Sequence, residues 1–321
     1  MSEQNFQDIK ILSESDIKGL LNMGDAINAM ESAFSSFSEG STYVPQRSVS
    51  SINDLNLFLK PAYNEKLGRI CVKILTQKKE AKPGIPTILG VVLLMDMKTG
   101  AILSMMDGAS ITALRTGAAS GIATKLLAAE NSDTMAVFGC GTQGKTQVEA
   151  VCNVRPIKRA LLYDLNTDAA VKLKREIEEK ENISVEVVNS PEYLYDVNII
   201  CTATNSKNPL FSWNDITKGT HINAIGSYKP EMQEIDPEII KNGNLFVDSK
   251  ESVLKESGDL IKPINENIFD ESVIIGEIGE LINNKINGRR DDNEITIFKS
   301  VGLGVQDLFM ANMIYEKYSQ Q

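Results

Sequence analysis

The sequence predicts a two-domain α/β protein in which a doubly wound parallel sheet is inserted beside an α+β domain. Its 321 residues are about twice the size of a usual single domain. From residue 133 onward, short apolar runs that suit buried strands alternate with turns and helical stretches, which is typical of a parallel sheet covered by helices. Before residue 107 the strand-like runs follow one another closely, which indicates an antiparallel sheet or part of a barrel.

Helices are expected on either side of this first group of strands. Ser13, followed three residues later by Asp16, is typical of a helix N-terminus, and residues 25–37 carry apolar side chains at helical spacing up to a stop at Gly40. Residues 110–129 are rich in Ala, Leu and Gly and predict a helix that packs closely on its neighbours. The strand-like runs between these helices are RSVSSI, NLFLK, RICVKIL, TILGVVLLMD and AILSMM.

The second group of strands begins at TMAVFG. Residues 167–180 are densely charged and predict a helix with a solvated outer face. After residue 298, KSVGLGVQDLFMANMIYEKY predicts a glycine-containing loop and a terminal helix that returns to the first domain. The further strand candidates are RALLYDL, SVEVVN, NIICTAT, THINAIG and NLFVD.

Composition and charge exclude several classes of function. Hydrophobic residues make up 42% of the chain and charged residues 24%, which is ordinary for a globular protein. The formal charge of −10 disfavours nucleic acid or an anionic membrane as a main partner, because the field of the protein repels phosphate. The polar start MSEQNFQDIK does not resemble a signal peptide, and no apolar run approaches the roughly 18 residues that span a bilayer. We therefore expect a cytoplasmic protein.

The cysteines and the single histidine argue against disulfides and metal chemistry. Cys71, Cys140, Cys152 and Cys201 form no C-x-x-C pair, so we expect reduced thiols. His221 has no second histidine with which to bind zinc or build a Ser/His/Asp triad. We expect no metal site.

A glycine motif predicts a dinucleotide site. Gly139, Gly141 and Gly144 fit G-x-G-x-x-G, a pattern that is weak alone. Here it follows the strand-like run TMAVF and opens the helical stretch KTQVEAV, so that backbone N–H groups at a helix N-terminus can face a pyrophosphate. This context favours a Rossmann-type domain over a glycine turn without a ligand.

Asp164 favours NAD as the dinucleotide. It ends the next strand about 20 residues beyond the motif, where a carboxylate can accept hydrogen bonds from the ribose hydroxyls. Its neighbours Leu165 and Asn166 offer no guanidinium to a 2′-phosphate, so NADP is the less favoured cofactor. The alternative is that Asp164 only forms a turn after the strand.

Four stretches of the chain resemble one known family. They are TALRTGAASGIATKLLA, GIPTILGVVLLMDMKTGAILSMMDG, THINAIGSYKPEMQEID and the pair GEIGELINNKINGR with FKSVGLGVQDL. From end to end the chain is similar to the ornithine cyclodeaminase and mu-crystallin family. That family includes ornithine cyclodeaminases, some alanine dehydrogenases and reductases of cyclic α-imino acids such as pyrroline-2-carboxylate, and mu-crystallin has ketimine reductase activity.

The resemblance implies two domains with different functions. It implies that residues 1–129 and 299–321 form a substrate-binding and dimerisation domain, and that residues 130–298 form an inserted NAD-binding Rossmann domain. A homodimer is therefore expected.

Three basic residues match family positions that hold the substrate: Arg47 in VPQRS, Lys73 in CVKIL and Arg115 in ALRTG. Their chemistry suits an amino or imino acid, because the planar fork of arginine binds a carboxylate through two hydrogen bonds. Taken singly, such residues are more often surface charges. Arg115, however, lies among small helix residues, where an unpaired buried charge is costly. Burial of Lys73 in an apolar strand would lower its pKa and suit it to proton transfer.

Other residues match family positions around the two ligands. For the cofactor these are Thr87, Arg115, Thr142, Gln143, Thr202, Gly226 and Ser300, beside the motif glycines and Asp164. For the substrate they are Tyr228 and Val301.

One position departs from the pattern of true ornithine cyclodeaminases. The resemblance implies an aspartate in the stretch AIGSYKP, where this chain has Tyr228. A phenol is a poor base at neutral pH, whereas cyclodeamination needs a group that handles the substrate's second amine. The chain therefore favours an NAD-dependent oxidoreductase that exchanges hydride with Cα of a small α-imino or α-amino acid. The alternatives are an ornithine cyclodeaminase that uses NAD catalytically and a non-catalytic small-molecule binder of the crystallin kind.

Overall fold

The computed structural model describes residues 9–78 and 88–321. The chain forms two compact units: unit 1 comprises Met1–Arg115 with Leu303–Gln321, and unit 2 comprises Thr116–Gly302. The chain leaves unit 1 within helix α3 (Gly108–Leu127) and returns to it just before the last helix, α10 (Gly304–Ser319). The predicted domain boundaries, 129/130 and 298/299, are defined by role and stay a prediction.

Unit 1 contains a seven-stranded sheet with the order β1-β7-β6-β5-β4-β2, in which β3 pairs with β4. Every pair is antiparallel except β1 with β7, so the predicted antiparallel sheet is confirmed. The strands are β1 (Lys10–Leu12), β2 (Thr42–Tyr43), β3 (Ser48–Ile52), β4 (Leu55–Asn64), β5 (Arg69–Lys78), β6 (Ile88–Asp96) and β7 (Ile102–Asp107).

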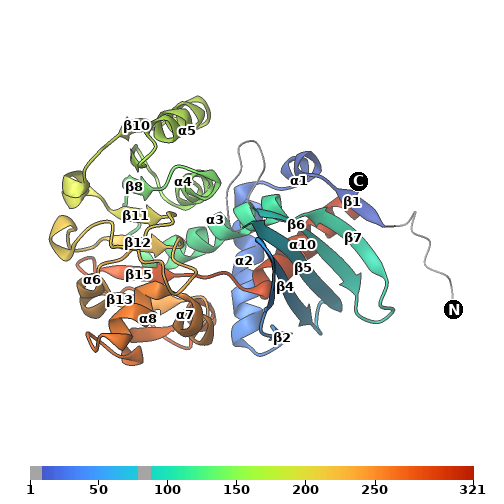
Figure 1. Cartoon of the computed structure of the whole chain (residues 1–321). Helices are drawn as coiled ribbons and strands as arrows, with labels where there is room; N and C mark the ends of the chain where they lie inside the picture. The colour runs from blue at the N-terminus through green and yellow to red at the C-terminus, as the bar shows by residue number, and fades with distance from the viewer. Residues whose placement is uncertain (1–8, 79–87) are drawn as a thin grey trace. The chain divides into compact units, whose positions relative to one another are not determined.

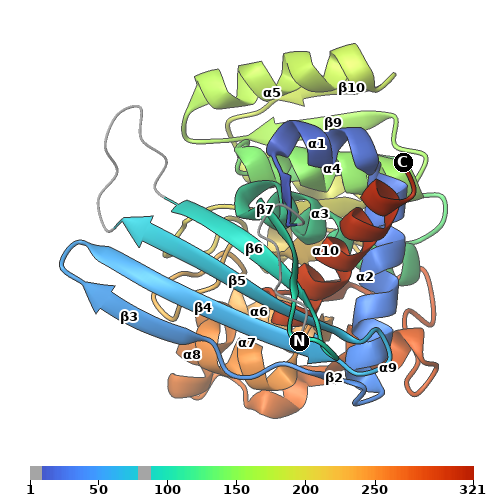
Figure 2. The same cartoon turned by 90° about the vertical axis from the view of Figure 1, so that its right-hand side faces the viewer.

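The first helix of unit 1 begins at its predicted cap, and the second begins shortly before its predicted range of residues 25–37. α1 (Glu14–Leu20) starts after Ser13, whose backbone N–H donates to the Asp16 carboxylate over 2.8 Å while its side chain accepts from the Asp16 N–H. α2 (Met23–Ser38) buries the apolar positions that sequence periodicity picks out, including Met30 and Phe34. α10 packs against α2 and against β4, β5 and β6, and Figure 2 shows the two helices beside the sheet.

The two faces of this sheet differ in their covering. Ala62, Cys71 and Leu94 lie opposite one another on neighbouring strands and are fully buried, on the face that α10 packs against. Lys60 and Lys73 form the next opposed pair on the same face. The sheet therefore presents two lysines to the side where the terminal helix lies.

Unit 2 contains an eight-stranded parallel sheet with the order β10-β9-β8-β11-β12-β15-β13-β14. Figure 1 shows this order running from β10 at the top of the unit to β13 near the bottom. The strands are β8 (Thr134–Phe138), β9 (Arg159–Tyr163), β10 (Ser184–Val187), β11 (Ile199–Thr202), β12 (His221–Ala224), β13 (Asn244–Val247), β14 (Ile274–Glu277) and β15 (Thr296–Lys299). The helices are α4 (Thr142–Val154), α5 (Thr167–Lys180), α6 (Pro237–Asn242), α7 (Lys250–Glu256), α8 (Gly258–Asn265) and α9 (Ile278–Ile282), with 3₁₀ turns η2 (Pro191–Asp196), η3 (Trp213–Asp215) and η4 (Glu271–Val273).

Apolar residues of alternate strand positions enter two separate cores. Met135 and Val137 of β8 pack in one core with residues of α4 and α5, whereas Ala136 and Phe138 pack in the other with residues of α6, α7 and α8. Helices therefore cover both faces, as the doubly wound prediction requires. Sequence patterns missed β14 and β15, whose four residues each are too few to show a period.

The strand order places a switch point at β8. From β8 the chain builds β9 and β10 on one side, and then β11 and β12 on the other. In sheets of this kind, ligands bind in the crevice beyond the carboxyl ends of the two strands at the switch. In unit 2 those strands are β8 and β11.

Candidate functional site

A buried ion pair links the sheet of unit 1 to its terminal helix. Lys73, in the middle of β5, places its Nζ 2.8 Å from the carboxylate of Asp307 in the first turn of α10. The side chains of Lys73 and Asp307 are 2% and 1% exposed. Arg115 of α3 approaches the same carboxylate, with 3.5 Å between its Nε and the Asp307 Oδ1. Two cations thus share one buried anion.

Close packing and side-chain hydrogen bonds fix the start of α10. A Cβ at Gly304 would lie only 2.9 Å from the carbonyl oxygen of Pro61, so glycine lets the helix approach β4. Gln306 uses its Oε1 to accept hydrogen bonds from the backbone N–H of Leu303 and from Nη1 of Arg115, at 3.1 and 2.9 Å. These contacts hold the Asp307 carboxylate beside Lys73.

The charges in this cluster shift one another's pKa. The cations Lys73, Arg115 and Lys60 lower the pKa of Asp307 despite its burial, so the carboxylate is ionised. Burial, reinforced by Arg115, lowers the pKa of Lys73 even though Asp307 opposes the shift. This is the direction that a buried strand position predicts. The pKa of Lys60 falls to about 7, through burial and then through Lys73, Arg47 and Arg115.

Arg47 belongs to the same neighbourhood. Its side chain is partly buried, and its guanidinium carbon lies 5.9 Å from the centroid of the Phe58 ring, within reach of a cation–π interaction. Phe58 is two residues before Lys60 on β4 and shares its face. The structure therefore brings together the three predicted substrate residues, Arg47, Lys73 and Arg115, within unit 1.

Sequence reasoning missed Asp307 and Lys60 as members of the cluster. A signal for Asp307 exists, because it is an acid within the apolar stretch VQDLFMA and a buried acid needs a cation. Lys60 likewise lies among apolar neighbours in the run LFLKPA, as Lys73 does in CVKIL.

In unit 2 the glycine motif forms a tight turn between β8 and α4. Gly139 has φ +94°, which only glycine adopts readily, and a Cβ there would meet the carbonyl oxygen of Ala203 after β11. A Cβ at Gly144 would overlap the carbonyl oxygen of Gly139. Gly141 is the N-cap of α4, where no side chain caps the helix and a Cβ would meet open space. The first backbone N–H groups of α4 are thus left for an anion.

Thr142 and Gln143 open α4. The side chain of Thr142 is exposed, whereas Gln143 Oε1 is buried and makes no hydrogen bond among the described residues. Asp164 accepts from the backbone N–H groups of Cys140 and Asn166, at 2.7 and 2.8 Å. It is therefore anchored to the glycine turn and remains partly exposed, beside a Leu165 side chain that is 93% exposed.

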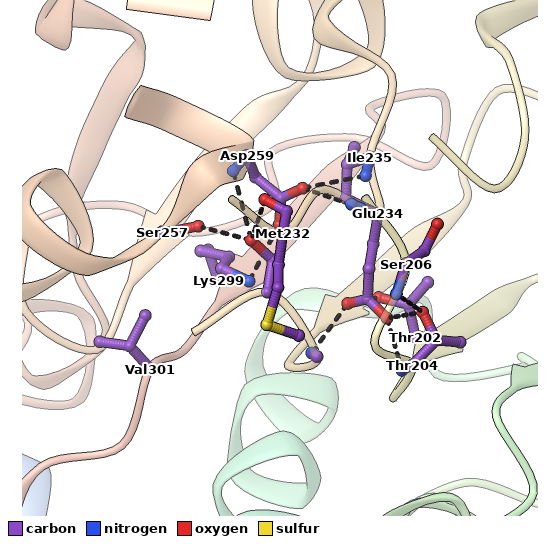
Figure 3. Close-up of polar contacts among 12 residues, drawn as sticks. Thr202, Thr204, Ser206, Met232, Glu234, Ile235, Ser257, Asp259, Lys299 and Val301 are labelled. Carbon is purple, nitrogen blue, oxygen red and sulfur yellow. Dashed lines mark hydrogen bonds and ion pairs between the residues drawn. The ribbon is translucent and has the colours of Figure 1, made fainter. Parts of the chain in front are cut away.

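A buried carboxylate ties together two loops beyond β11 and β12. Glu234 accepts from the Thr202 hydroxyl, from the N–H and hydroxyl of Thr204 and from the Gly226 N–H, at 2.6 to 2.8 Å (Figure 3). Burial raises the pKa of Glu234, with a smaller contribution from Asp259. The hydroxyl of Thr202 is thus engaged with Glu234, which also holds the backbone N–H groups of Thr204 and Gly226.

A second buried carboxylate holds the predicted positions after β15. Asp248 accepts from the Ser300 hydroxyl and from the N–H groups of Val301 and Gly302, at 2.7 to 2.9 Å. Val301 packs in the apolar core on the α6 side, and Tyr228 packs against the same core. The predicted site residues of unit 2 thus lie in three groups: the glycine turn with Asp164, the Glu234 network and the Asp248 loop. Thr87 lies outside the described residues.

An ion pair buried between β15 and α8 completes the support of these loops. Lys299 Nζ lies 2.9 Å from Asp259 Oδ2, and both side chains are at most 1% exposed (Figure 3). Asp259 also accepts from the N–H groups of Glu234 and Ile235. Sequence patterns did not predict roles for Glu234, for Asp248 or for the pair of Lys299 and Asp259. A signal for Asp248 exists, because it directly follows a strand just as Asp164 does.

The turn fits a dinucleotide. A pyrophosphate can bind at its uncapped helix start beside the close-packed glycines, and a ribose can bind at the carboxylate that follows β9.

The described residues, 9–78 and 88–321, contain no group of three or more His, Cys, Asp or Glu placed to hold a metal ion. None of the helices in these ranges is long and apolar enough to cross a membrane.

The profile of the ornithine cyclodeaminase/mu-crystallin family matches residues 7–321. The chain belongs to this family. A family member, a Delta(1)-pyrroline-2-carboxylate reductase of Bacillus cereus, is 40% identical over 312 residues, which are 96% of each chain.

Two solved structures of family members have the same fold as this chain. The Delta(1)-pyrroline-2-carboxylate reductase of Thermococcus litoralis, in complex with NADH and L-proline, is 39% identical, with a TM-score of 0.93 over 97% of this chain and 98% of that one. An archaeal alanine dehydrogenase dimer with bound NAD is 33% identical, with a TM-score of 0.91 over 97% and 96%. The predicted family and the α/β class with a Rossmann-type sheet are confirmed, and these relatives match the predicted type of activity and cofactor.

Proposed function

We propose that this member of the ornithine cyclodeaminase/mu-crystallin family is an NAD-dependent oxidoreductase that reduces small α-imino acids. The observation that carries the proposal is the buried cluster of Lys73, Arg115 and Asp307. Gln306 Nε2 is buried there without a hydrogen-bond partner among the described residues, and Arg115 Nε makes only its 3.5 Å ion pair with Asp307. Buried donors in a native fold normally have partners, so the Gln306 amide supports a polar ligand at this cluster.

The roles follow from the chemistry of each group. Arg115 and Arg47 bind the substrate carboxylate, since a guanidinium offers paired donors to it. Lys73 orients the substrate nitrogen, and its lowered pKa suits it to hold or give up a proton there. Asp307 holds the Lys73 side chain in position through its hydrogen bond, and its negative charge favours the protonated lysine that can donate a proton. Bound NADH supplies the hydride that Cα receives.

The cofactor contacts are also a proposal. Gly139, Gly141 and Gly144 with Thr142 and Gln143 would hold the pyrophosphate at the start of α4. Asp164 would accept from the ribose hydroxyls, which favours NAD over NADP. Thr202, Gly226, Ser300 and Thr87 remain proposed cofactor residues, and Tyr228 and Val301 proposed substrate residues.

The test is a substrate panel assayed with NADH and NADPH: pyrroline-2-carboxylate, piperideine-2-carboxylate, pyruvate with ammonia, and ornithine. We expect Lys73→Met to lower kcat on the best imine by about 10² to 10⁴, the usual size of a general acid–base contribution. Arg115→Lys should raise KM, because lysine keeps the charge but not the fork. Lys66→Met, an exposed lysine paired with Glu39, is the matched control and should leave turnover unchanged. Full turnover by both site variants, with normal circular dichroism, would show the assignment to be wrong.

Net consumption of NADH separates the alternatives. A reductase oxidises NADH in proportion to imine reduced. An ornithine cyclodeaminase would release ammonia and form proline from ornithine with no net change in NAD. A non-catalytic binder would consume nothing.

We further propose a homodimer in the cytoplasm. The sheet face of unit 1 opposite α10 carries Leu59, Ile74 and Val91 side by side, and Leu59 is 36% exposed. Leu89 on the same face is 54% exposed, and an apolar face of this kind suits a partner subunit. The four cysteines are free thiols, as suits a reducing compartment. Light scattering should give twice the chain mass, and Ile74→Glu should halve it; a wild-type monomer would refute the dimer.

A further inference from the structure

Glu234 joins the loops that follow β11 and β12 in unit 2. Its side chain is fully buried, and each carboxylate oxygen accepts two hydrogen bonds (Figure 3). Oε1 accepts from the backbone N–H and the hydroxyl of Thr204, at 2.6 and 2.8 Å. Oε2 accepts from the Thr202 hydroxyl and from the backbone N–H of Gly226, both at 2.8 Å. One anion therefore holds two backbone segments together at the carboxyl ends of neighbouring strands.

The loop after β11 also packs against the glycine turn. A Cβ at Gly139 would meet the carbonyl oxygen of Ala203 and lie 3.2 Å from Cγ2 of Thr204. A Cβ at Gly226 would meet Glu234 Oε1 and lie 2.5 Å from the carbonyl oxygen of Thr204. Glycine at both positions lets these backbones approach so closely. Glu234 thus fixes a loop that is in direct contact with the dinucleotide turn.

The backbone of Glu234 is held independently of its side chain. Asp259 Oδ1 accepts from the N–H groups of Glu234 and Ile235, at 2.7 and 3.1 Å. Asp259 Oδ2 lies 2.9 Å from Lys299 Nζ, and the carbonyl oxygen of Glu234 accepts from the N–H of Leu210 at 2.8 Å. A buried ion pair is weak evidence for stability, because removing two charges from water offsets much of their attraction. The network therefore points to precise placement of the Glu234 carboxylate.

The strand order divides unit 2 into two halves. β8, β9 and β10 lie on one side with the glycine turn and Asp164, and β11, β12 and β15 lie on the other. In doubly wound sheets each half binds one mononucleotide of a dinucleotide. We propose that Glu234 is a positioning residue for the nicotinamide mononucleotide of NAD(H), through the loops after β11 and β12. This rests on the proposed function, which assigns the adenosine ribose to Asp164.

Glutamine at this position cannot replace the carboxylate. A side-chain amide has one acceptor oxygen and one NH₂ group, which only donates. If its oxygen accepts from Thr204, its NH₂ group faces the N–H of Gly226, and in the opposite orientation it faces the N–H of Thr204. In either case two donors face each other, and one loop must move. The nicotinamide half of the crevice would then have to be re-formed when NADH binds, which lowers the affinity.

NADH and ADP separate the two halves of the crevice. ADP carries the adenosine and the pyrophosphate of NADH but not the second ribose or the nicotinamide. Calorimetry of both ligands with the whole chain gives two dissociation constants without turnover. The variants are Glu234→Gln and the milder Thr204→Val, which removes one hydroxyl donor to Glu234. The matched control is Glu294→Gln, because Glu294 pairs with Arg290 before β15, at the amino ends of the strands, and its side chain is 13% exposed.

We expect Glu234→Gln to raise the Kd of NADH by roughly tenfold to a hundredfold, the worth of a hydrogen bond to a charged group, and that of ADP by less than about threefold. Thr204→Val should raise the Kd of NADH by at least about threefold, again with little change for ADP. Glu294→Gln should leave both constants unchanged. Asp164→Ser should weaken both ligands, because both carry the adenosine ribose.

Two results would overturn the proposal. One is an unchanged Kd of NADH in both Glu234→Gln and Thr204→Val. The other is an equal loss of affinity for NADH and ADP, which would show a general loosening of unit 2. If Glu234→Gln does not fold, Thr204→Val decides by the same comparison.

The wild type separates this proposal from the proposed function. A wild type that binds NADH but reduces no imine would refute the proposed function, and the two dissociation constants would still decide the role of Glu234. A wild type that binds no NADH would refute both.

Discussion

The buried pair of Lys73 and Asp307 offers the most demanding test of the site. Asp307→Asn removes an anion that contacts both Lys73 and Arg115 and changes the side-chain volume little. Breaking a buried pair by removal of one partner costs about 3 to 5 kcal/mol, because the remaining charge is buried without compensation. We therefore expect the free energy of unfolding at pH 7 to fall by about this amount.

The loss should depend on pH with a defined sign. Without Asp307, the pKa of Lys73 loses the charge that raises it and falls further below the value of about 10.4 in the unfolded chain. Between these two values the unfolded chain binds more protons, so the free energy of unfolding rises with pH. The deficit of Asp307→Asn is therefore fully present near neutral pH and shrinks as pH approaches 10.

Urea unfolding followed by circular dichroism at pH 7 and pH 9.5 measures both effects. Glu39→Gln is the control, since Glu39 pairs with Lys66 at 2.7 Å on the surface, where an ion pair contributes less than about 1 kcal/mol. The reasoning is refuted if Asp307→Asn unfolds at the wild-type urea concentration at pH 7, or if its deficit does not shrink at pH 9.5.

Three further predictions concern unit 2. Gly144→Ala should abolish NADH binding in calorimetry, because its methyl group would overlap the carbonyl oxygen of Gly139, whereas Gly19→Ala, with open space around it, should bind normally. Asp164→Ser should lower the preference for NADH over NADPH by roughly tenfold in kcat/KM, since a charged hydrogen-bond acceptor is lost; an unchanged ratio would remove Asp164 from the ribose site. Burial lowers the pKa of His221 to about 3, so the unfolded chain takes up its proton first and stability falls as pH drops from about 6.5 toward 3, by up to about 1.4 kcal/mol per unit. His221→Gln should lack this part of the slope in urea titrations between pH 7 and 4.5, and parallel curves would contradict it.

Local signals in the sequence were sufficient for much of the fold. The capping pair of Ser13 and Asp16, the apolar period of residues 25–37 and the glycines at 139, 141 and 144 each act within a few residues, so their structures could be predicted without the rest of the chain. The place of β15 could not, because a four-residue strand joins the sheet between β12 and β13 only through its neighbours.

The sequence by itself indicated that Lys73 and Arg115 sit in apolar surroundings and need compensation, and that a glycine turn of the G-x-G-x-x-G type follows β8. Only the tertiary structure decided which group compensates them. Asp307 reaches Lys73 across 234 residues of sequence, and Lys60 faces it across a strand pair. A buried charge requires a partner in space, and the distance between two side chains depends on how the whole unit folds, which no local pattern encodes.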